Sequence, residues 1–104
     1  MKNLEKINAL LGFAQKAGKL VSGDNTCRAK FKKIHLIVLA SDCSPATNEY
    51  YRALCHREKK PILTMGNRVE LGTAIGKSPR TVLGITDVNF ARQILQLITG
   101  EERE

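Results

Sequence analysis

The chain has 104 residues, enough for one compact domain, and its hydrophobic fraction of 42% is that of an ordinary globular protein. It carries 17 Lys and Arg against 10 Asp and Glu, a net charge of +7, which favours a polyanionic partner such as nucleic acid. Three Phe, two Tyr and no Trp offer few rings for stacking unpaired bases, which disfavours binding of single strands and favours binding of a structured nucleic-acid backbone.

Several other classes of protein are disfavoured by the sequence. No apolar run is long enough to cross a bilayer and no signal peptide is visible, so we expect a soluble cytoplasmic protein without a membrane partner. Cys27, Cys43 and Cys55 lack the spacing of a zinc site or of a disulfide framework, and we expect free thiols and no metal. Residues 1–100 are predicted to form a single domain, followed by an acidic, disordered tail at 101–104.

Helices and strands alternate along the chain. Apolar residues spaced three and four apart predict a helix from Leu4 to Ala17, which Gly18 ends. A brief strand at 19–23 follows, and then a short helix towards Phe31, for which Asp24 or Asn25 is a candidate cap. The branched apolar run at 34–40 predicts a central strand covered on both faces.

The second half of the chain continues this alternation. Ser44 and Pro45 are typical of a helix start, and this helix should end before Pro61. A strand at 61–65, a helix beginning at Asn67, a strand at 80–86 and a last helix capped by Asp87 complete the order. The sequence therefore predicts an α/β fold, a three-layer α/β/α sandwich with a four-stranded mixed sheet.

The turn before the second helix has the chemistry of a binding site. Gly23 allows close approach of the backbone, and the Asn25 amide offers a donor and an acceptor to a base edge. Arg28, one turn later, can reach a phosphate or a guanine. Lys30, Lys32 and Lys33 either contact phosphates or form a solvated helix face. Asp24 and Asn25 either read base edges or cap the helix.

Three phrases, "LLGFAQKAGKLVSG", "LIVLASDCSP" and "LGTAIGKSPRTVLGITD", resemble in wording and order the kink-turn-binding ribosomal protein family. This is the superfamily of the large-subunit proteins L-seven-Ae and L-thirty-e, and the resemblance is strongest to its bacterial YlxQ-like branch. It covers nearly the whole chain, from Ile7 to Ile98. It implies an α/β/α sandwich that binds kink-turn RNA, a sharply bent helix flanked by sheared G·A pairs, without metal, cofactor or catalysis.

The resemblance also implies which residues contact RNA. The reading turn would be Gly23 to Thr26 with Arg28 behind it, and the loop from Gly76 to Arg80 would cover the bases flipped out at the kink. A basic residue at the start of the preceding helix would contact the RNA backbone, and Ser44 would lie in the same groove. The full set of predicted RNA-binding residues is Lys19, Gly23, Asp24, Asn25, Thr26, Arg28, Ser44, Arg68, Lys77, Ser78, Pro79 and Arg80.

Two departures from the family pattern leave an alternative function open. Family members that read the G·A pairs most strongly have Glu after the Asn, where this chain has Thr26. The segment between Gly23 and the strand at 34–40 is also about two residues shorter than in relatives. The alternative is therefore a protein-protein interaction module on the same fold that has lost specific RNA reading.

An enzymatic role is disfavoured. Cys55 and His56 are adjacent, but neighbouring helical residues diverge by about 100° and do not face each other. No nucleophile, base and orienting group stand at useful spacing, so we expect neither catalysis nor a small-molecule substrate.

We expect a monomer associated with the ribosome or translation. Gly72 has two interpretations, close packing of its helix on the sheet or a role in binding.

Overall fold

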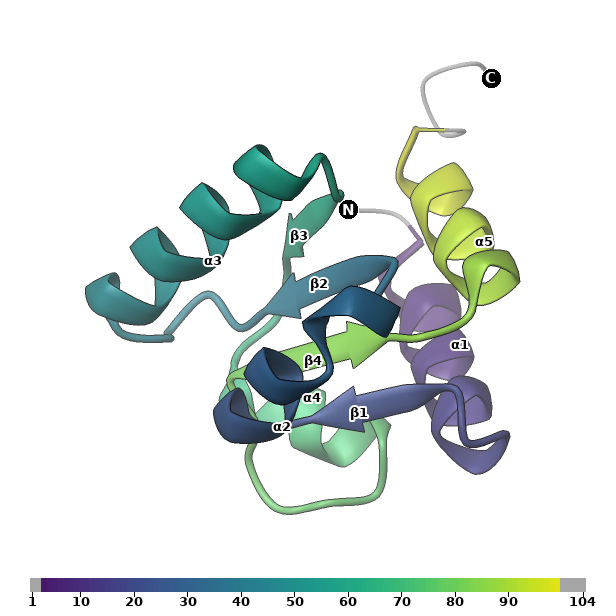
Figure 1. The fold of residues 1–104 in the computed structure, drawn as a ribbon. Coiled ribbons are helices and arrows are strands. Elements are labelled where there is room, and N and C mark those ends of the chain that lie inside the picture. The colour runs from purple at the N-terminus through teal and green to yellow at the C-terminus, as the bar shows by residue number, and fades with distance from the viewer. Residues whose placement is uncertain (1–2, 100–104) are drawn as a thin grey trace.

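The structure is a computed structural model that describes residues 3–99, and within this range no helix is long and apolar enough to cross a membrane. Within the described residues, four strands form one sheet in the order β1-β4-β2-β3 (Figure 1). β2 and β3 are parallel, whereas β4 runs antiparallel to β1 and β2, so the sheet is mixed. The strands are β1 (Leu20–Ser22), β2 (Leu36–Leu39), β3 (Ile62–Thr64) and β4 (Val82–Ile85).

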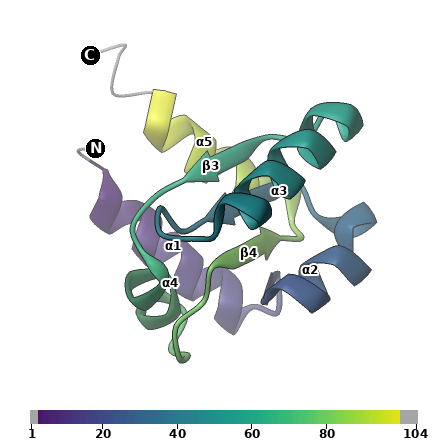
Figure 2. The same cartoon turned by 90° about the vertical axis from the view of Figure 1, so that its left-hand side faces the viewer.

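The helices cover both faces of this sheet, and Figure 2 shows the resulting three layers. Leu36 and Val38 of β2 pack in the core with side chains of α1, α4 and α5, whereas Ile37 and Leu39 pack with those of α2 and α3. All residues of β2 and β4 are buried, which confirms the predicted central strand and the predicted α/β/α sandwich. The helices are α1 (Leu4–Lys16), α2 (Asp24–Ala29), α3 (Pro45–Glu58), α4 (Arg68–Ala74) and α5 (Val88–Thr99).

Helix caps predicted from the sequence are present at two helix starts. Ser44 Oγ accepts a hydrogen bond from the Thr47 amide at 3.1 Å, and Pro45 takes the first position of α3, where its missing amide costs nothing. Asp87 Oδ2 accepts from the Phe90 amide at 3.0 Å at the start of α5. These local signals fix where the helices begin, and hence where the loops between layers lie.

α2 differs from its prediction at both ends. Neither Asp24 nor Asn25 caps it, because Gly23 is the N-cap residue and no side chain bonds the first-turn amides. The helix stops at Ala29 after six residues, and a separate turn of 3-10 helix, η1 (Phe31–Lys33), leads into β2. The capping interpretation is therefore wrong, and the Asp24 carboxylate has different partners. The tail at 101–104 lies outside the described residues.

Candidate nucleic-acid interface

Most of the predicted RNA-binding residues lie at one end of the sheet. β1 and β2 end there, at Ser22 and Leu39, and the antiparallel β4 begins there, at Val82. The turn after β1, the loop after β2 and the loop before β4 therefore meet at the left end of the sheet in Figure 1. Hydrogen bonds between these segments, described below, hold them together.

The turn after β1 depends on Gly23. Its φ of +95° lies in a region that residues with a Cβ rarely adopt, so the sharp entry into α2 requires glycine. The Gly23 amide donates to the Val82 carbonyl at 2.9 Å, which ties the turn to the start of β4. Asn25 and Thr26 follow Asp24 and are exposed. The turn therefore gives them fixed positions on the first turn of α2.

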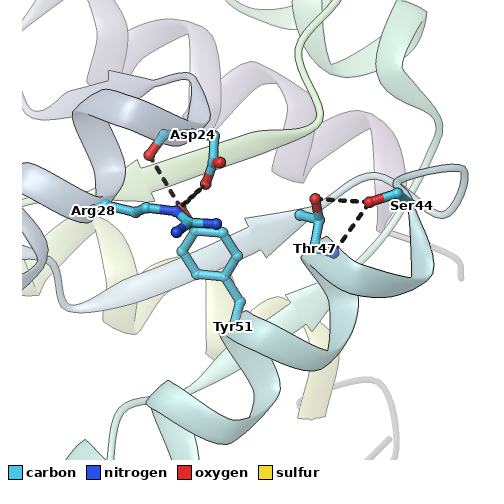
Figure 3. Close-up of polar contacts among 5 residues, drawn as sticks. All are labelled: Asp24, Arg28, Ser44, Thr47 and Tyr51. Carbon is cyan, nitrogen blue, oxygen red and sulfur yellow. Dashed lines mark hydrogen bonds and ion pairs between the residues drawn. The ribbon is translucent and has the colours of Figure 1, made fainter.

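Asp24 is anchored rather than free (Figure 3). Its Oδ1 accepts hydrogen bonds from Arg28 Nε at 2.9 Å and from the Tyr51 hydroxyl of α3 at 2.6 Å. The bond from Tyr51 is the largest cause that lowers the pKa of Asp24; partial burial opposes it, and Arg28 adds to the lowering. Asp24 thus fastens the start of α2 to α3.

Arg28 is shared between this anchor and an aromatic ring. Its guanidinium carbon lies 3.9 Å from the centroid of the Tyr50 ring, a cation-π contact. Tyr50 in turn packs edge-on against Tyr51, with ring centroids 5.0 Å apart. The Arg28 side chain remains 45% exposed, and its terminal amino groups have no hydrogen-bond partner among residues 3–99. They are available to a phosphate.

The loop after β2 is held to the start of α4. The Arg68 amide donates to Asp42 Oδ1 at 2.9 Å, and its guanidinium lies 3.3 Å from Asp42 Oδ2 and bonds the Asp42 carbonyl at 2.9 Å. Asn67 and Glu70 form a reciprocal capping box at the same helix start. Two of the three guanidinium nitrogens of Arg68 thus donate within the protein. The Ser44 hydroxyl is likewise engaged in its cap (Figure 3).

The loop from Gly76 to Arg80 is braced by Arg80. Arg80 Nη1 donates to Ser78 Oγ at 2.7 Å and to the Ser78 and Pro79 carbonyls, and Nε donates to Ser22 Oγ at 3.2 Å. The last of these bonds joins the loop to the residue that precedes the turn at Gly23. The two segments predicted to contact RNA are therefore neighbours in space, although Ser22 and Arg80 are 58 positions apart along the chain.

Gly72 packs closely on this loop. A Cβ at residue 72 would lie 2.7 Å from the carbonyl carbon of Ser78 and 2.9 Å from Pro79 Cα, closer than real contacts allow. The predicted close packing is therefore present, with a different partner. Only glycine lets α4 and the loop approach in this way, and the contact helps to keep the loop in one conformation.

Three of the predicted residues have side chains free to bind. Asn25, Thr26 and Lys77 are exposed, and within residues 3–99 no hydrogen bond or ion pair engages their side chains. Lys19 is placed elsewhere: it precedes β1, its carbonyl accepts from the Thr86 amide, and it lies at the opposite end of the sheet. The structure does not bring Lys19 together with the other predicted residues.

Two of the three thiols, those of Cys27 and Cys55, are unsuited to nucleophilic chemistry. Burial, with a further contribution from Asp24, raises the pKa of Cys27 to about 12, and burial also raises the pKa of Cys55. Both therefore remain protonated at neutral pH. Among residues 3–99, no three His, Cys, Asp or Glu side chains come together as metal ligands would.

Sequence reasoning missed the residues that hold the interface together. Tyr51 and Asp42 anchor Asp24 and Arg68, and Tyr50 covers Arg28. The adjacent tyrosines on an otherwise polar helix were a signal that could have been used, since the chain has no others. No local pattern marks Asp42 as the partner of Arg68, 26 residues away.

The fold and this end of the sheet define a class, a small α/β/α domain with a glycine turn and a braced loop side by side. Residues 5–95 match the ribosomal protein L7Ae/L30e/S12e/Gadd45 family, and the chain belongs to it. It is 33% identical to the RNA-binding protein YlxQ of Bacillus subtilis (strain 168), over 86% of this chain and 91% of the relative. It is 32% identical to YlxQ of Enterococcus faecium, over 94% and 96%.

Other relatives extend this comparison. The large ribosomal subunit protein eL30 of Euphorbia esula is 34% identical over 96% of this chain and 92% of its own length. A solved protein of unknown function from Bacillus halodurans C has 33% identity and a TM-score of 0.86, covering 90% of this chain and 97% of that one. The resemblance to a YlxQ-like member of the family, expected from the sequence, is thus confirmed.

Proposed function

We propose that this protein is a non-enzymatic RNA-binding protein that recognises a kink-turn or a similarly bent RNA, as a monomer associated with the ribosome or with translation. The proposal rests above all on one observation. The turn at Gly23 and the loop at 76–80 are joined by the hydrogen bond from Arg80 to Ser22, and each carries an unengaged polar side chain. The names of the relatives, RNA-binding protein and ribosomal protein, agree with it.

The roles divide between supports and contacts. Asn25 is the base reader, because its free amide can donate and accept at one base edge. Lys77 and the terminal amino groups of Arg28 neutralise phosphates crowded at the bend. Asp24, Arg68 and Arg80 hold these groups in place through the bonds described above. A braced interface loses little conformational entropy on binding.

Binding of a kink-turn RNA and of the same RNA with its G·A pairs replaced tests the proposal. A fluorophore pair on the two RNA stems reports the bend while the protein is titrated at two salt concentrations. We expect tight binding that folds the first RNA and much weaker binding of the second. Equal, weak binding of both RNAs that disappears at moderate salt would reject the reading function and point to protein partners. In that case Thr26, which stands where strong readers carry Glu, is the first position to examine.

A further inference from the structure

A second basic surface lies next to the proposed reading site, at the C-terminal end of α2. It is a groove of about 590 Å³ between α2 with η1 and the helix α3. Both helices cover the same face of the sheet, as Figure 2 shows. Four cationic residues line this groove against a single acidic one, Glu58: they are Arg28, Lys30, Lys32 and Lys33. We propose that this groove is a second RNA site, which binds the phosphate backbone of a helical stem without reading its sequence.

The lysines of the groove are free to bind an anion. Lys30, Lys32 and Lys33 are exposed, and among residues 3–99 none has a carboxylate within ion-pairing distance. The one acidic residue, Glu58, lies 3.5 Å from Arg57, so part of its charge is already compensated. Uncompensated cations gathered on one concave surface raise the local concentration of an anionic partner.

A fourth lysine fixes the backbone that carries them. Lys60 Nζ donates to the Phe31 carbonyl at 2.6 Å and to the Lys32 carbonyl at 3.3 Å, and it lies 4.4 Å from the centroid of the Phe31 ring. On the same wall, Arg28 of α2 is held by Asp24 and Tyr50. The groove is therefore organised before any ligand arrives.

The chemistry of the groove fits phosphate better than peptide. The Phe31 and Lys32 carbonyls are occupied by Lys60, and the Lys30 carbonyl accepts from the Lys33 amide at 2.9 Å. The groove thus offers many donors and few acceptors. A docked peptide brings amide donors that would find few partners, which is costly, whereas the phosphate oxygens of a nucleic acid are acceptors only.

The position of the groove on α2 indicates RNA as the source of the phosphates. Asn25 stands on the first turn of the same short helix, and Arg28 faces both regions. An RNA held at Asn25 can extend a stem along α2 into the groove. The inference rests on the proposed function in taking RNA as the ligand, but it does not depend on kink-turn reading.

Two matched variants test the groove. The groove variant combines Lys30→Ala, Lys32→Ala and Lys33→Ala. The control variant removes the same charge from exposed positions on α1 and α5, across the sheet, by Lys6→Ala, Lys16→Ala and Arg92→Ala. Affinity for a kink-turn RNA and for a plain RNA duplex is measured by fluorescence anisotropy over a range of salt concentrations, with thermal unfolding as a check of folding.

We expect the affinity of the groove variant for both RNAs to be lower than that of the control variant by about tenfold or more. The magnitude of its slope of log K against log salt should fall by about 2 to 3. The ratio of the affinities for the two RNAs should equal that of the wild type, because the residues proposed to read the bases are unchanged. Equal losses in the groove and control variants would overturn the proposal. If the wild type does not prefer the kink-turn RNA, the affinities of the two variants for the duplex still test whether the groove binds RNA. A wild-type protein that binds neither RNA would overturn both the proposed function and the second RNA site.

The unmodified protein gives an independent readout. Backbone amide signals are followed by NMR while a short RNA duplex is added to the wild type. We expect the largest shifts at residues 28–33 and at Tyr50 and Leu54, which line the groove. Shifts confined to the turn at Gly23 and the loop at 76–80 would show that the duplex does not use the groove.

Discussion

The Tyr51 hydroxyl on α3 donates a 2.6 Å hydrogen bond to Asp24 Oδ1 on α2, and its ring is completely buried. The same hydroxyl lies 3.2 Å from the Asp24 carbonyl oxygen. One phenol therefore holds the first residue of the helix that presents Asn25. This relationship turns a six-residue helix, too short to be stable alone, into a fixed platform.

Tyr51→Phe should destabilise the protein, because it removes a hydrogen bond to an ionised group while keeping the ring. Hydrogen bonds to charged groups contribute roughly 1.5 to 3 kcal/mol, so we expect a loss within this range in urea unfolding. The matched control is Tyr50→Phe, whose ring can still stack on Arg28. If the two variants were equally stable, the bond to Asp24 would have no role as an anchor.

Alkaline titration of the Tyr51 hydroxyl should report on the same hydrogen bond. Burial, and after it the hydrogen bond to Asp24, raises the pKa of Tyr51, so its contribution to stability is present below the unfolded-state value of about 10 and is lost as pH rises. In Tyr50→Phe, Tyr51 is the one remaining tyrosine. We expect its tyrosinate absorbance to grow only with alkaline unfolding, followed in parallel by circular dichroism. Ionisation near pH 10 in the folded protein would contradict the burial.

Acid titration should report the other partner. The pKa of Asp24 is lowered, so its contribution to the free energy of unfolding is present above the unfolded-state value of 3.8 and is lost as pH falls below it. Asp24→Asn should flatten the loss of stability in this acidic range relative to the wild type, as measured by urea unfolding at a series of pH values. An unchanged pH profile would mean that the carboxylate is not linked to folding.

Whether an interaction could be predicted from the sequence depends on how far apart its partners are along the chain. Ser44, Pro45 and Asp87 act within one helical turn, so their patterns located α3 and α5 correctly. The partners of Asp24 could not be predicted in this way, because Tyr51 is 27 residues away and meets it only after α2 and α3 pack on one face of the sheet. Local reasoning therefore offered a helix cap as one of two roles for the carboxylate, and the structure shows that Asp24 does not form it.

The same limit applies to the interface. The sequence and its resemblance indicated both segments that meet at the end of the sheet, but they did not separate supports from contacts. Arg68 and Arg80 were predicted to contact RNA, and the structure shows two guanidinium nitrogens of each bound to Asp42, Ser22 and the 76–80 loop. Basic residues look alike in a sequence, and only their acceptors distinguish them.

Gly72→Ala should disturb the 76–80 loop. At an exposed helical site the change would stabilise the helix by about 1 kcal/mol, but here the added Cβ would meet the Ser78 backbone. We therefore expect lower thermal stability and weaker RNA binding. Thr73→Ala, on the same helix and exposed, is the control and should leave both nearly unchanged. A more stable Gly72→Ala protein with normal RNA affinity would show that the loop moves freely.

Asn25→Ala and Lys77→Ala should separate base reading from charge at the proposed interface. Asn25 can make a paired donor and acceptor contact, so its loss should cost about 1 to 3 kcal/mol for a kink-turn RNA and much less for a plain duplex. Lys77 contributes a charge that both RNAs attract, so Lys77→Ala should weaken both alike and lower the salt slope by about 1. Both side chains are exposed and unengaged within residues 3–99, so neither change should alter the melting temperature. Equal losses on the two RNAs for Asn25→Ala would remove it as a base reader and leave the interface with backbone contacts alone.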